Sequence, residues 1–520
     1  MTNVSIEQGM IAGAESDGVY RFLGLPYAAP PVGDRRWRPP ARPESWASVR
    51  DATEFGNAAV QTLGTGLTGI DLRAEESEDC LYLNVWTPTL DSAAAQPVMV
   101  WIHGGGFLFG AASQDDRYDG AKLAGQGVTV VTLNYRLGAF GFLAHPEMGA
   151  NFAVLDWVAA LSWVAANIAS FGGDGNNVTI FGQSAGGAAV RILLSTPAAR
   201  GLFHRAVIQS AGFEYYAGVP SPSYQRTVRA SEQVCDHLGS RDANVLRGID
   251  TEKIREASLA FASISPPSGQ VPTPANHSWY PVAEDDVVFE HDFLGWAPEV
   301  PVMLGCVQHE ARTFITPTGV HAAPTMKPSE TYTLETLEHM AMALGGDAHA
   351  DILAFFADSG AAPYDALEEL YSAAIWYEPA LATLERFADL GRRTYYYHFA
   401  RVAPGARGPE PSVRLGHGAE VPYIFGNLTP ADAYDQVDTA VSKAVQHAWI
   451  EFARTGVPRG RDGSRLPQYD SAAPRLTVIT DAVEASPLTV DTVTQMIHAL
   501  RTRAAVDVPP ASAQVADAQP

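Results

Sequence analysis

Six short runs of apolar, β-branched and aromatic residues recur along the chain, with helical patterns between them. The runs are PVMVWI (97–102), VTVVTLNY (128–135), VTIFG (178–182), RAVIQS (205–210), PVMLG (301–305) and TYYYHF (394–399). Strands that are apolar on both faces and alternate with helices are typical of a parallel sheet covered on both sides. The chain is therefore predicted to adopt an α/β fold, in which ligands bind outside the carboxyl ends of the strands.

The segment NFAVLDWVAALSWVAANIASFGGD separates the second run from the third and predicts one long helix. Apolar residues at steps of four and three define the face expected to pack on the sheet, namely Val154, Val158, Leu161, Ala165 and Ile168. Trp157 and Trp163 are interpreted as packing residues. Gly172 and Gly173 are expected to end the helix.

The third run leads into a tight turn, Gly-Gln-Ser-Ala-Gly, and then into the small-residue segment AGGAAVRILL (185–194). A strand, a turn and a helix in this order expose one serine, Ser184, as a nucleophile. Gly182 and Gly186 suit such a turn because a Cβ at either position would clash with neighbouring backbone. The helix that follows directs its first N–H groups at the same point, where they stabilise negative charge.

Two residues that could assist Ser184 follow later strands. Glu310 lies five residues beyond PVMLG, and His417 follows TYYYHF in the sequence LGHGAEVPYIFG. An imidazole can take the serine proton, while a carboxylate fixes the tautomer and stabilises the imidazolium. The order serine, acid, histidine is the one that α/β-hydrolases use. His309 is the rival to His417, but it occupies the position expected for the acid.

A third element, HGGGF (103–107), directly follows the strand at 97–102. Consecutive glycines leave backbone N–H groups uncovered and able to approach an oxyanion. Gly105 and Gly106, with the N–H of Ala185, are therefore predicted to form an oxyanion hole with three donors. This chemistry requires no metal and no organic cofactor.

The charge and the cysteine content of the chain limit the partners and the cellular compartment that are expected. The formal net charge is −23 and the basic residues form no stripe, which argues against nucleic acid as a partner. The N-terminus lacks a basic and apolar leader, and no run approaches 18 consecutive apolar residues, so neither export nor membrane spanning is expected. The cysteines, Cys80, Cys235 and Cys306, are too few for a disulfide framework, so a reducing cytoplasm is expected. The Ala/Pro-rich segment 503–520 is expected to be a mobile tail.

Taken together, these motifs resemble the type-B carboxylesterase family, which includes the cholinesterases. Further matching segments are GLPYAAPPVGDRRW (24–37), SEDCLYLNVWTP (77–88), LNYRLGAFGFL (133–143), GLFHRAVIQSAG (201–212) and AWIEFARTGVP (448–458). The resemblance implies the α/β-hydrolase fold in one domain over residues 1–502, with cap insertions near 211–300 and 306–393. It implies the roles already considered: Ser184 as nucleophile, Glu310 as acid, His417 as base, and Gly105, Gly106 and Ala185 as oxyanion donors.

The resemblance also implies two architectural ion pairs, Arg36 with Glu78 and Arg136 with Asp174. Two departures from the family stand out. Cys80 lacks the upstream cysteine with which many secreted relatives form a disulfide, so the loop 62–77 is expected to be untethered at the pocket mouth. Gln183 replaces the glutamate that commonly precedes the nucleophile, which removes a negative charge beside the site.

The sequence thus predicts a serine carboxylesterase that acts through an acyl-enzyme, with neutral small or medium esters as substrates. Leu108 and Phe109, beside the glycine loop, are candidate pocket residues. An amidase, a carbamate hydrolase or a lipase with the same triad remains an alternative. A non-catalytic interaction protein on this fold is a further one, although the intact triad argues against it. Monomer and homodimer are equally open.

Overall fold

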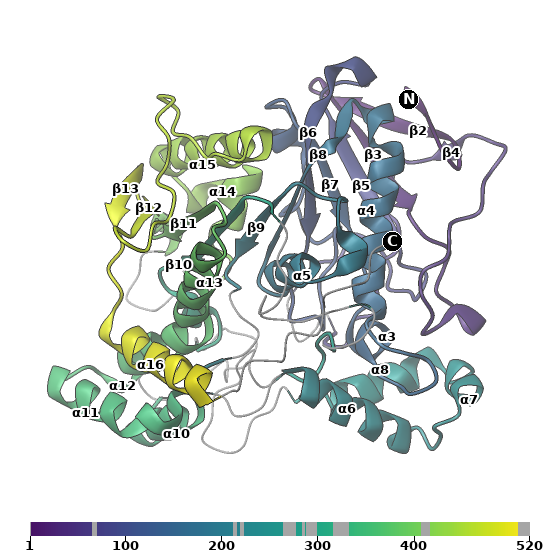
Figure 1. The fold of residues 1–520 in the computed structure, drawn as a ribbon. Helices are drawn as coiled ribbons and strands as arrows, with labels where there is room; N and C mark the ends of the chain where they lie inside the picture. The colour runs from purple at the N-terminus through teal and green to yellow at the C-terminus, as the bar shows by residue number, and fades with distance from the viewer. Residues whose placement is uncertain are drawn as a thin grey trace, which may run out of the picture.

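In the computed structural model, the residues described are 2–64, 70–211, 216–218, 223–263, 277–282, 287, 299–315, 332–406 and 416–507. One large mixed sheet runs through this part of the chain (Figure 1). Its strands are β1 (Thr2–Ile6), β2 (Gly9–Ser16), β3 (Val19–Pro26), β4 (Arg50–Asp51), β5 (Tyr82–Thr87), β6 (Gln96–Ile102), β7 (Thr129–Leu133), β8 (Gly173–Gln183), β9 (Arg205–Gln209), β10 (Val302–Val307), β11 (Thr394–Phe399), β12 (Arg475–Ile479) and β13 (Val483–Pro487).

The strand order is β1-β2-β3-β5-β7-β6-β8-β9-β10-β11-β12-β13, with β4 paired to β2. From β7 to β12 every neighbouring pair is parallel, while the strands at both edges pair antiparallel. The six predicted strands are β6 to β11, and together they form most of this parallel centre. The predicted α/β fold is confirmed, because parallel neighbours place the loops after β6, β8, β10 and β11 at one edge of the sheet.

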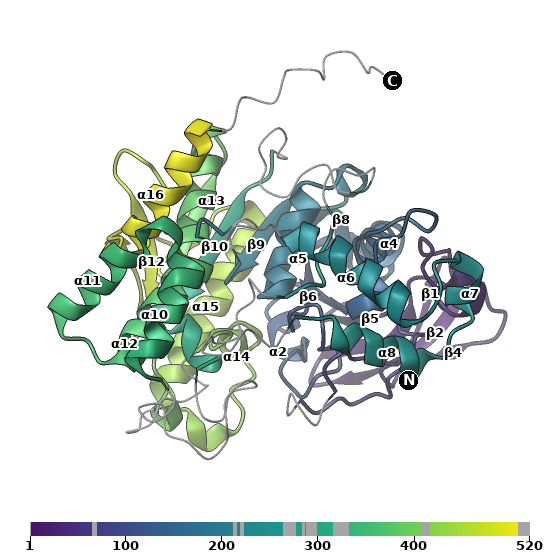
Figure 2. The same ribbon diagram turned by 90° about the horizontal axis from the view of Figure 1, so that it is seen from below.

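Helices cover both faces of the sheet (Figures 1 and 2). They are α2 (Ala121–Ala124), α3 (Gly138–Phe142), α4 (Phe152–Asn167), α5 (Ala185–Leu194), α6 (Ser223–His237), α7 (Ala243–Arg247), α8 (Thr251–Ala260), α10 (Leu334–Gly345), α11 (His349–Ser359), α12 (Pro363–Ser372), α13 (Glu378–Asp389), α14 (Val421–Phe425), α15 (Gln436–Thr455) and α16 (Thr492–Asp507). The predicted insertions contain α6 to α8 and α10 to α13. These two groups lie at the same end of the molecule, on opposite sides in Figure 1.

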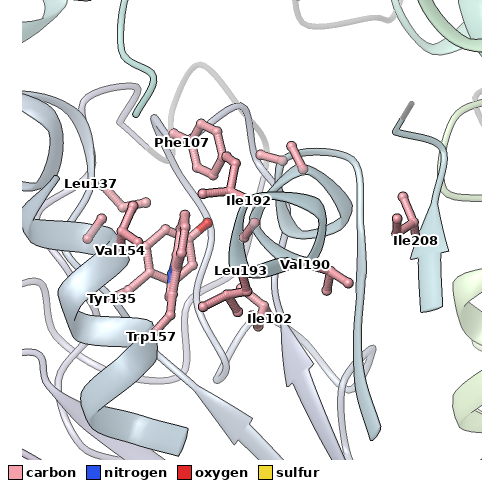
Figure 3. Close-up of a cluster of buried hydrophobic side chains, with 14 of the residues drawn as sticks. Ile102, Phe107, Tyr135, Leu137, Val154, Trp157, Val190, Ile192, Leu193 and Ile208 are labelled. Carbon is pink, nitrogen blue, oxygen red and sulfur yellow. The ribbon is translucent and has the colours of Figure 1, made fainter. Parts of the chain in front are cut away.

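The central strands are buried on both faces because successive side chains point to opposite sides of the sheet. Along β6, Val100 and Ile102 face the core that contains α4 and α5, while Met99 and Trp101 face the core that contains α14 and α15. Figure 3 shows Ile102 beside helix α5 and its residue Leu193. The apolar character of both faces therefore has a direct structural cause.

Most of the predicted helix face is buried, because Val154, Leu161 and Ile168 are fully buried. Val158 is half-buried and Ala165 is exposed, while Trp157 is buried as a packing residue, as predicted. The buried surface differs in part from the predicted stripe because the helix is apolar on most of its surface. It is also long and apolar enough, with the turn that follows it, to meet the criteria for a membrane span, but most of it is buried inside the fold, as in a core helix.

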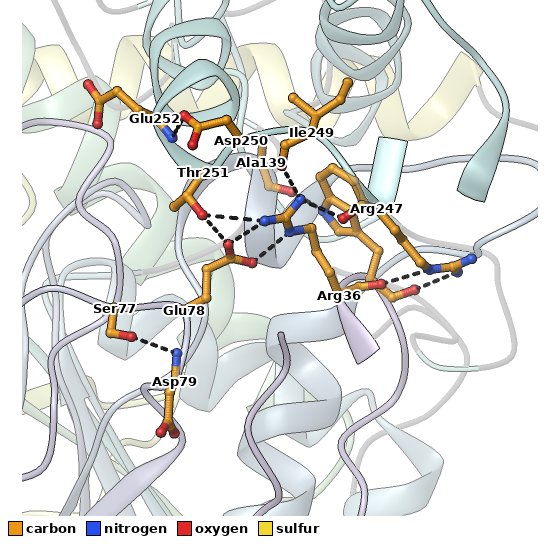
Figure 4. Close-up of polar contacts among 11 residues, drawn as sticks. Arg36, Ser77, Glu78, Asp79, Ala139, Arg247, Ile249, Asp250, Thr251 and Glu252 are labelled. Carbon is orange, nitrogen blue, oxygen red and sulfur yellow. Dashed lines mark hydrogen bonds and ion pairs between the residues drawn. The ribbon is translucent and has the colours of Figure 1, made fainter. Parts of the chain in front are cut away.

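The ion pair between Arg36 and Glu78 is confirmed and forms part of a larger cluster (Figure 4). The guanidinium donates to both carboxylate oxygens, at 2.7 and 2.5 Å. It also donates to the backbone carbonyls of Arg247 and Ile249, while the Thr251 hydroxyl donates to Glu78. This cluster fastens the N-terminal segment to α7 and α8.

The second predicted ion pair gives Arg136 the wrong partner. Arg136, just after β7, binds Asp156 on α4 through two bonds of 2.8 and 2.6 Å, and both side chains are buried. Asp174 instead accepts a hydrogen bond from the backbone N–H of Asn176. Because a buried charge is costly unless it is paired, Asp156 is the residue that neutralises Arg136.

The chain end also differs from the prediction. Helix α16 continues to Asp507, five residues into the segment 503–520 that was expected to be a tail. The rest of that segment lies outside the described residues.

The free energy of unfolding should separate the two candidate partners of Arg136. Asp156→Ala leaves a buried guanidinium without its anion and should destabilise the protein by about 3–5 kcal/mol. Asp174→Ala is the matched control and should change stability by less than about 0.5 kcal/mol. Urea unfolding of the two variants measures both values, and equal losses would contradict the assignment.

Candidate active site

Ser184 occupies a sharply turned backbone between β8 and α5. Its φ of 58° and ψ of −127° lie where non-glycine residues are rare, so the turn is strained. The surrounding glycines are required by close packing. A Cβ on Gly182 would lie 2.4 Å from the carbonyl oxygen of Gly186, and one on Gly186 would lie 2.0 Å from that of Ile102. The turn holds Ser184 at the wall of a large cavity.

His417 and Glu310 meet although 107 residues separate them in the chain. The Nδ1 atom of His417 lies 2.6 Å from Oε2 of Glu310. Glu310 follows β10 and is fully buried, and its Oε1 accepts a hydrogen bond from the backbone N–H of Val307. The Nε2 atom of His417 has no hydrogen-bond partner among the residues described. His417 also lines the cavity that Ser184 borders.

The glycine loop after β6 is held in place from below. The Tyr135 hydroxyl donates to the carbonyl of His103 at 2.9 Å, and the Gly138 N–H donates to the carbonyl of Phe107 at 2.8 Å. The amide of Gln61 bonds both the N–H and the carbonyl of Gly110. Figure 3 shows Phe107 and Tyr135 in the apolar cluster beneath this loop. The loop is therefore rigidly supported.

Three residues whose backbone amides were predicted as oxyanion donors line the same cavity as Ser184. Gly105 and Gly106 have φ values of 114° and 61°, which favour glycine, and both line the cavity together with Ala185. In the described part of the chain, their N–H groups donate to no acceptor. Uncovered donors of this kind are suited to stabilise an oxyanion.

The cavity has a volume of about 690 Å³ and extends well beyond these residues. Phe109 lines it as predicted, but Leu108 does not, because its side chain points into the core. Sequence reasoning missed further lining residues, among them Asp115, Arg117, Arg191, His277, Trp279, Tyr280, Trp376 and Tyr434. These residues come from five separate segments and carry no common motif, so no sequence signal identified them.

The loop 62–77 reaches the cavity at two points, since Leu63 and Ile70 line it. Cys80 is a free, buried thiol. The described part of the loop is fastened by other means, because Arg73 forms an ion pair with Asp116 and its N–H donates to the carbonyl of Ser113. The expectation of an untethered loop is therefore wrong for its described part, and residues 65–69 lie outside that part.

Two other histidines near the site are engaged elsewhere. His309 pairs with Glu368 at 3.2 Å. Burial lowers the pKa of His103 to about 4, so this ring is neutral at pH 7 and serves as a packing partner of Tyr135. Among the residues described, no cluster of three or more His, Cys, Asp or Glu side chains could hold a metal ion.

A second buried carboxylate lies close to the pair of His417 and Glu310. Glu420 is 1% exposed, and its Oε1 accepts a hydrogen bond from Nε2 of Gln209 at 3.2 Å. Burial, reinforced by the Glu310 carboxylate, raises the pKa of Glu420 from 4.5 to about 7. Near neutral pH this group is therefore partly protonated and places less negative charge beside His417.

Comparisons with known proteins identify the family. The sequence model described as the carboxylesterase family matches residues 1–497. The chain is 33% identical to para-nitrobenzyl esterase of Bacillus subtilis over 92% of this chain and 94% of that protein. It is 34% identical to fumonisin B1 esterase of Sphingopyxis macrogoltabida over 89% of this chain and 84% of that protein. The solved carboxylesterase Est55 of Geobacillus stearothermophilus superimposes with a TM-score of 0.78 at 31% identity, covering 95% of this chain and 99% of that chain.

Gly105→Ala should lower kcat for p-nitrophenyl butyrate by about 100–1,000-fold, the usual cost of losing one oxyanion donor. The added Cβ would lie 2.0 Å from the carbonyl oxygen of Phe109, so the loop has to shift. The matched control is Gly18→Ala, at a φ of 77° with open space around it and far from the cavity. The control should keep kcat within about twofold. A Gly105→Ala enzyme with more than a tenth of wild-type kcat would refute this role.

Glu420→Gln should flatten the dependence of stability on pH. The folded-state pKa of about 7 lies above the unfolded value of 4.5, so stability is fully present below pH 4.5 and is lost as pH rises through 7. Between pH 5 and pH 8 the wild-type protein should lose roughly 2–3 kcal/mol from this carboxyl, and the glutamine variant should lose none of it. Urea unfolding at both pH values gives the comparison, and identical losses would count against the buried carboxyl.

Proposed function

The chain belongs to the carboxylesterase family and is a carboxylic ester hydrolase, and on that premise we propose that Ser184, His417 and Glu310 carry out the reaction. The observation that supports this most directly is the 2.6 Å contact between His417 and the buried Glu310 at the wall of the cavity that Ser184 borders. Proximity of a nucleophile, a base and an orienting acid is the arrangement that acyl transfer needs.

The contact with Glu310 sets the tautomer of His417. A carboxylate is an acceptor only, so Nδ1 of the neutral imidazole carries the proton and donates a hydrogen bond to Oε2 of Glu310. Nε2 then holds the free lone pair. In the proposed first step, Ser184 Oγ attacks the ester carbonyl carbon while Nε2 takes the hydroxyl proton, and the negative charge of Glu310 stabilises the imidazolium.

The tetrahedral intermediate places negative charge on the former carbonyl oxygen. The N–H groups of Gly105, Gly106 and Ala185 are proposed to bind this oxygen, and Ala185 adds the positive end of helix α5. Collapse of the intermediate breaks the ester bond, and Nε2 returns its proton to the departing alcohol. Water then attacks the acyl-enzyme with the same help, which releases the acid and restores Ser184.

The lining next to Ser184 supports neutral esters of small to medium size as substrates. Aromatic side chains line this cavity, among them Phe109, Trp279 and Trp376. The residue before the nucleophile is the uncharged Gln183, which also lines the cavity. A neutral side chain at that position leaves no carboxylate directly before Ser184 to attract a cationic alcohol group.

Ser184→Ala should lower kcat for p-nitrophenyl butyrate by roughly 10,000-fold or more, since the nucleophile is lost. Ser210→Ala is the matched control, because Ser210 lines the same cavity and also has a positive φ of 52°. The control should retain activity and labelling by a fluorophosphonate probe, whereas Ser184→Ala should lose both. Normal labelling of the Ser184 variant would overturn the assignment.

A further inference from the structure

A second cavity, of about 300 Å³, lies apart from the one that Ser184 borders. It is lined by residues of helix α13, strands β11, β12 and β13, the loop after β13 and the start of α16. Its volume is at the lower end of the range of about 300–1,000 Å³ that is typical of small-molecule sites. It shares no lining residue with the cavity that contains Ser184.

The lining suits an uncharged molecule. Apolar side chains make up half of it, among them Leu381, Leu476 and Val478. The carboxylate of Asp491 already has hydrogen-bond partners within the chain, because both its oxygens accept hydrogen bonds from Thr494 at 2.7 Å. His398 contributes a ring whose nitrogens have no hydrogen-bond partner in the described part of the chain. Burial lowers the pKa of His398, so the ring is neutral and can donate one hydrogen bond and accept another.

A π-helical segment, η8 (Ala373–Tyr377), links the two cavities. Pro379 gives a physical reason for the wide turn, because its ring has no N–H and would clash with the carbonyl of Ile375 in a regular helix. Consecutive side chains of η8 face different cavities. Trp376 lines the first and lies 5.0 Å, between ring centroids, from His417, whereas Tyr377 lines the second.

Tyr377 also bonds the turn that carries the acid. Its hydroxyl shares its one proton between the backbone carbonyls of Val307 and Gln308, and the N–H of Val307 donates a hydrogen bond to Glu310. The ring of Tyr377 lies 5.9 Å from that of His398 in the second cavity. A molecule that displaced Tyr377 would therefore loosen the support of Glu310 without touching Ser184.

We propose that the cavity between α13 and β12 is a regulatory site for a neutral molecule with an apolar body and one hydrogen-bonding group. His398 binds the polar group, the aliphatic side chains enclose the body, and Tyr377 transmits occupancy to Glu310. Binding at this site does not depend on the proposed function, whereas the effect on turnover rests on the proposed roles of Ser184, His417 and Glu310.

Methyl phenyl sulfone is a suitable probe, because it is neutral, has one polar acceptor group and is neither an ester nor a nucleophile. Titration calorimetry on the full chain should detect binding at one site. Val478→Phe fills the cavity and should weaken binding at least tenfold, and Leu488→Phe, in the loop after β13, should do the same if the first variant folds poorly. Val437→Phe is the matched control at an exposed valine on α15 and should bind normally. Normal binding by both cavity-filling variants would overturn the site.

The sulfone should lower kcat for p-nitrophenyl butyrate at least twofold and leave KM unchanged. Tyr377→Phe lacks the hydroxyl that bonds the turn, so its kcat should no longer respond to the sulfone although binding persists. Inhibition that raises KM alone would place the molecule at the catalytic cavity and refute the proposal. Binding without any change in kcat would refute the coupling through Tyr377. If Ser184→Ala proved fully active, the calorimetric result would still test the site.

Discussion

Direct backbone contact between β6, β8 and α5 is the constraint on which the site depends. Gly104 and Gly186 stand where a side chain would overlap a neighbouring carbonyl, so the strand end, the turn and the helix start approach as closely as bare backbone allows. This contact forces Ser184 into its unusual conformation and brings the glycine loop alongside it. The same close contact therefore positions the nucleophile and its proposed oxyanion donors. The apolar cluster around Tyr135 and Trp157 lies beneath this contact and supports it.

The electrostatic environment of His417 depends on which of the neighbouring acidic side chains are charged. Gln183 is neutral, and Glu420 is partly protonated near pH 7 because water is excluded from it. Glu310, fastened by the N–H of Val307 and by His417, is then the carboxylate whose charge acts on the base. A second full negative charge nearby would stabilise the imidazolium even before the ester binds. An imidazole that is already protonated cannot take the proton of Ser184.

Local glycine patterns and the order of the strands were enough to predict the residues at the centre of the site. The turn at Ser184 and the loop at Gly105 have recognisable glycine patterns, and the parallel sheet dictates that Glu310 and His417 meet at its carboxyl edge. Side-chain direction was not predictable in the same way. Phe107 has a φ of 60°, which reverses the loop and sends Leu108 into the core. The partner of Arg136 was equally hidden, since it depends on how α4 is rotated against the sheet.

The distance along the chain between Ser184 and His417 has a consequence for synthesis. During translation the turn at Ser184 emerges early, but its proposed base is added only when about four-fifths of the 520 residues have been made. Strand β11 and the helices that complete its side of the sheet come equally late. A ribosome-bound or truncated chain that ends before His417 therefore contains the serine and lacks its proposed base, so ester cleavage by this triad requires synthesis to continue past residue 417.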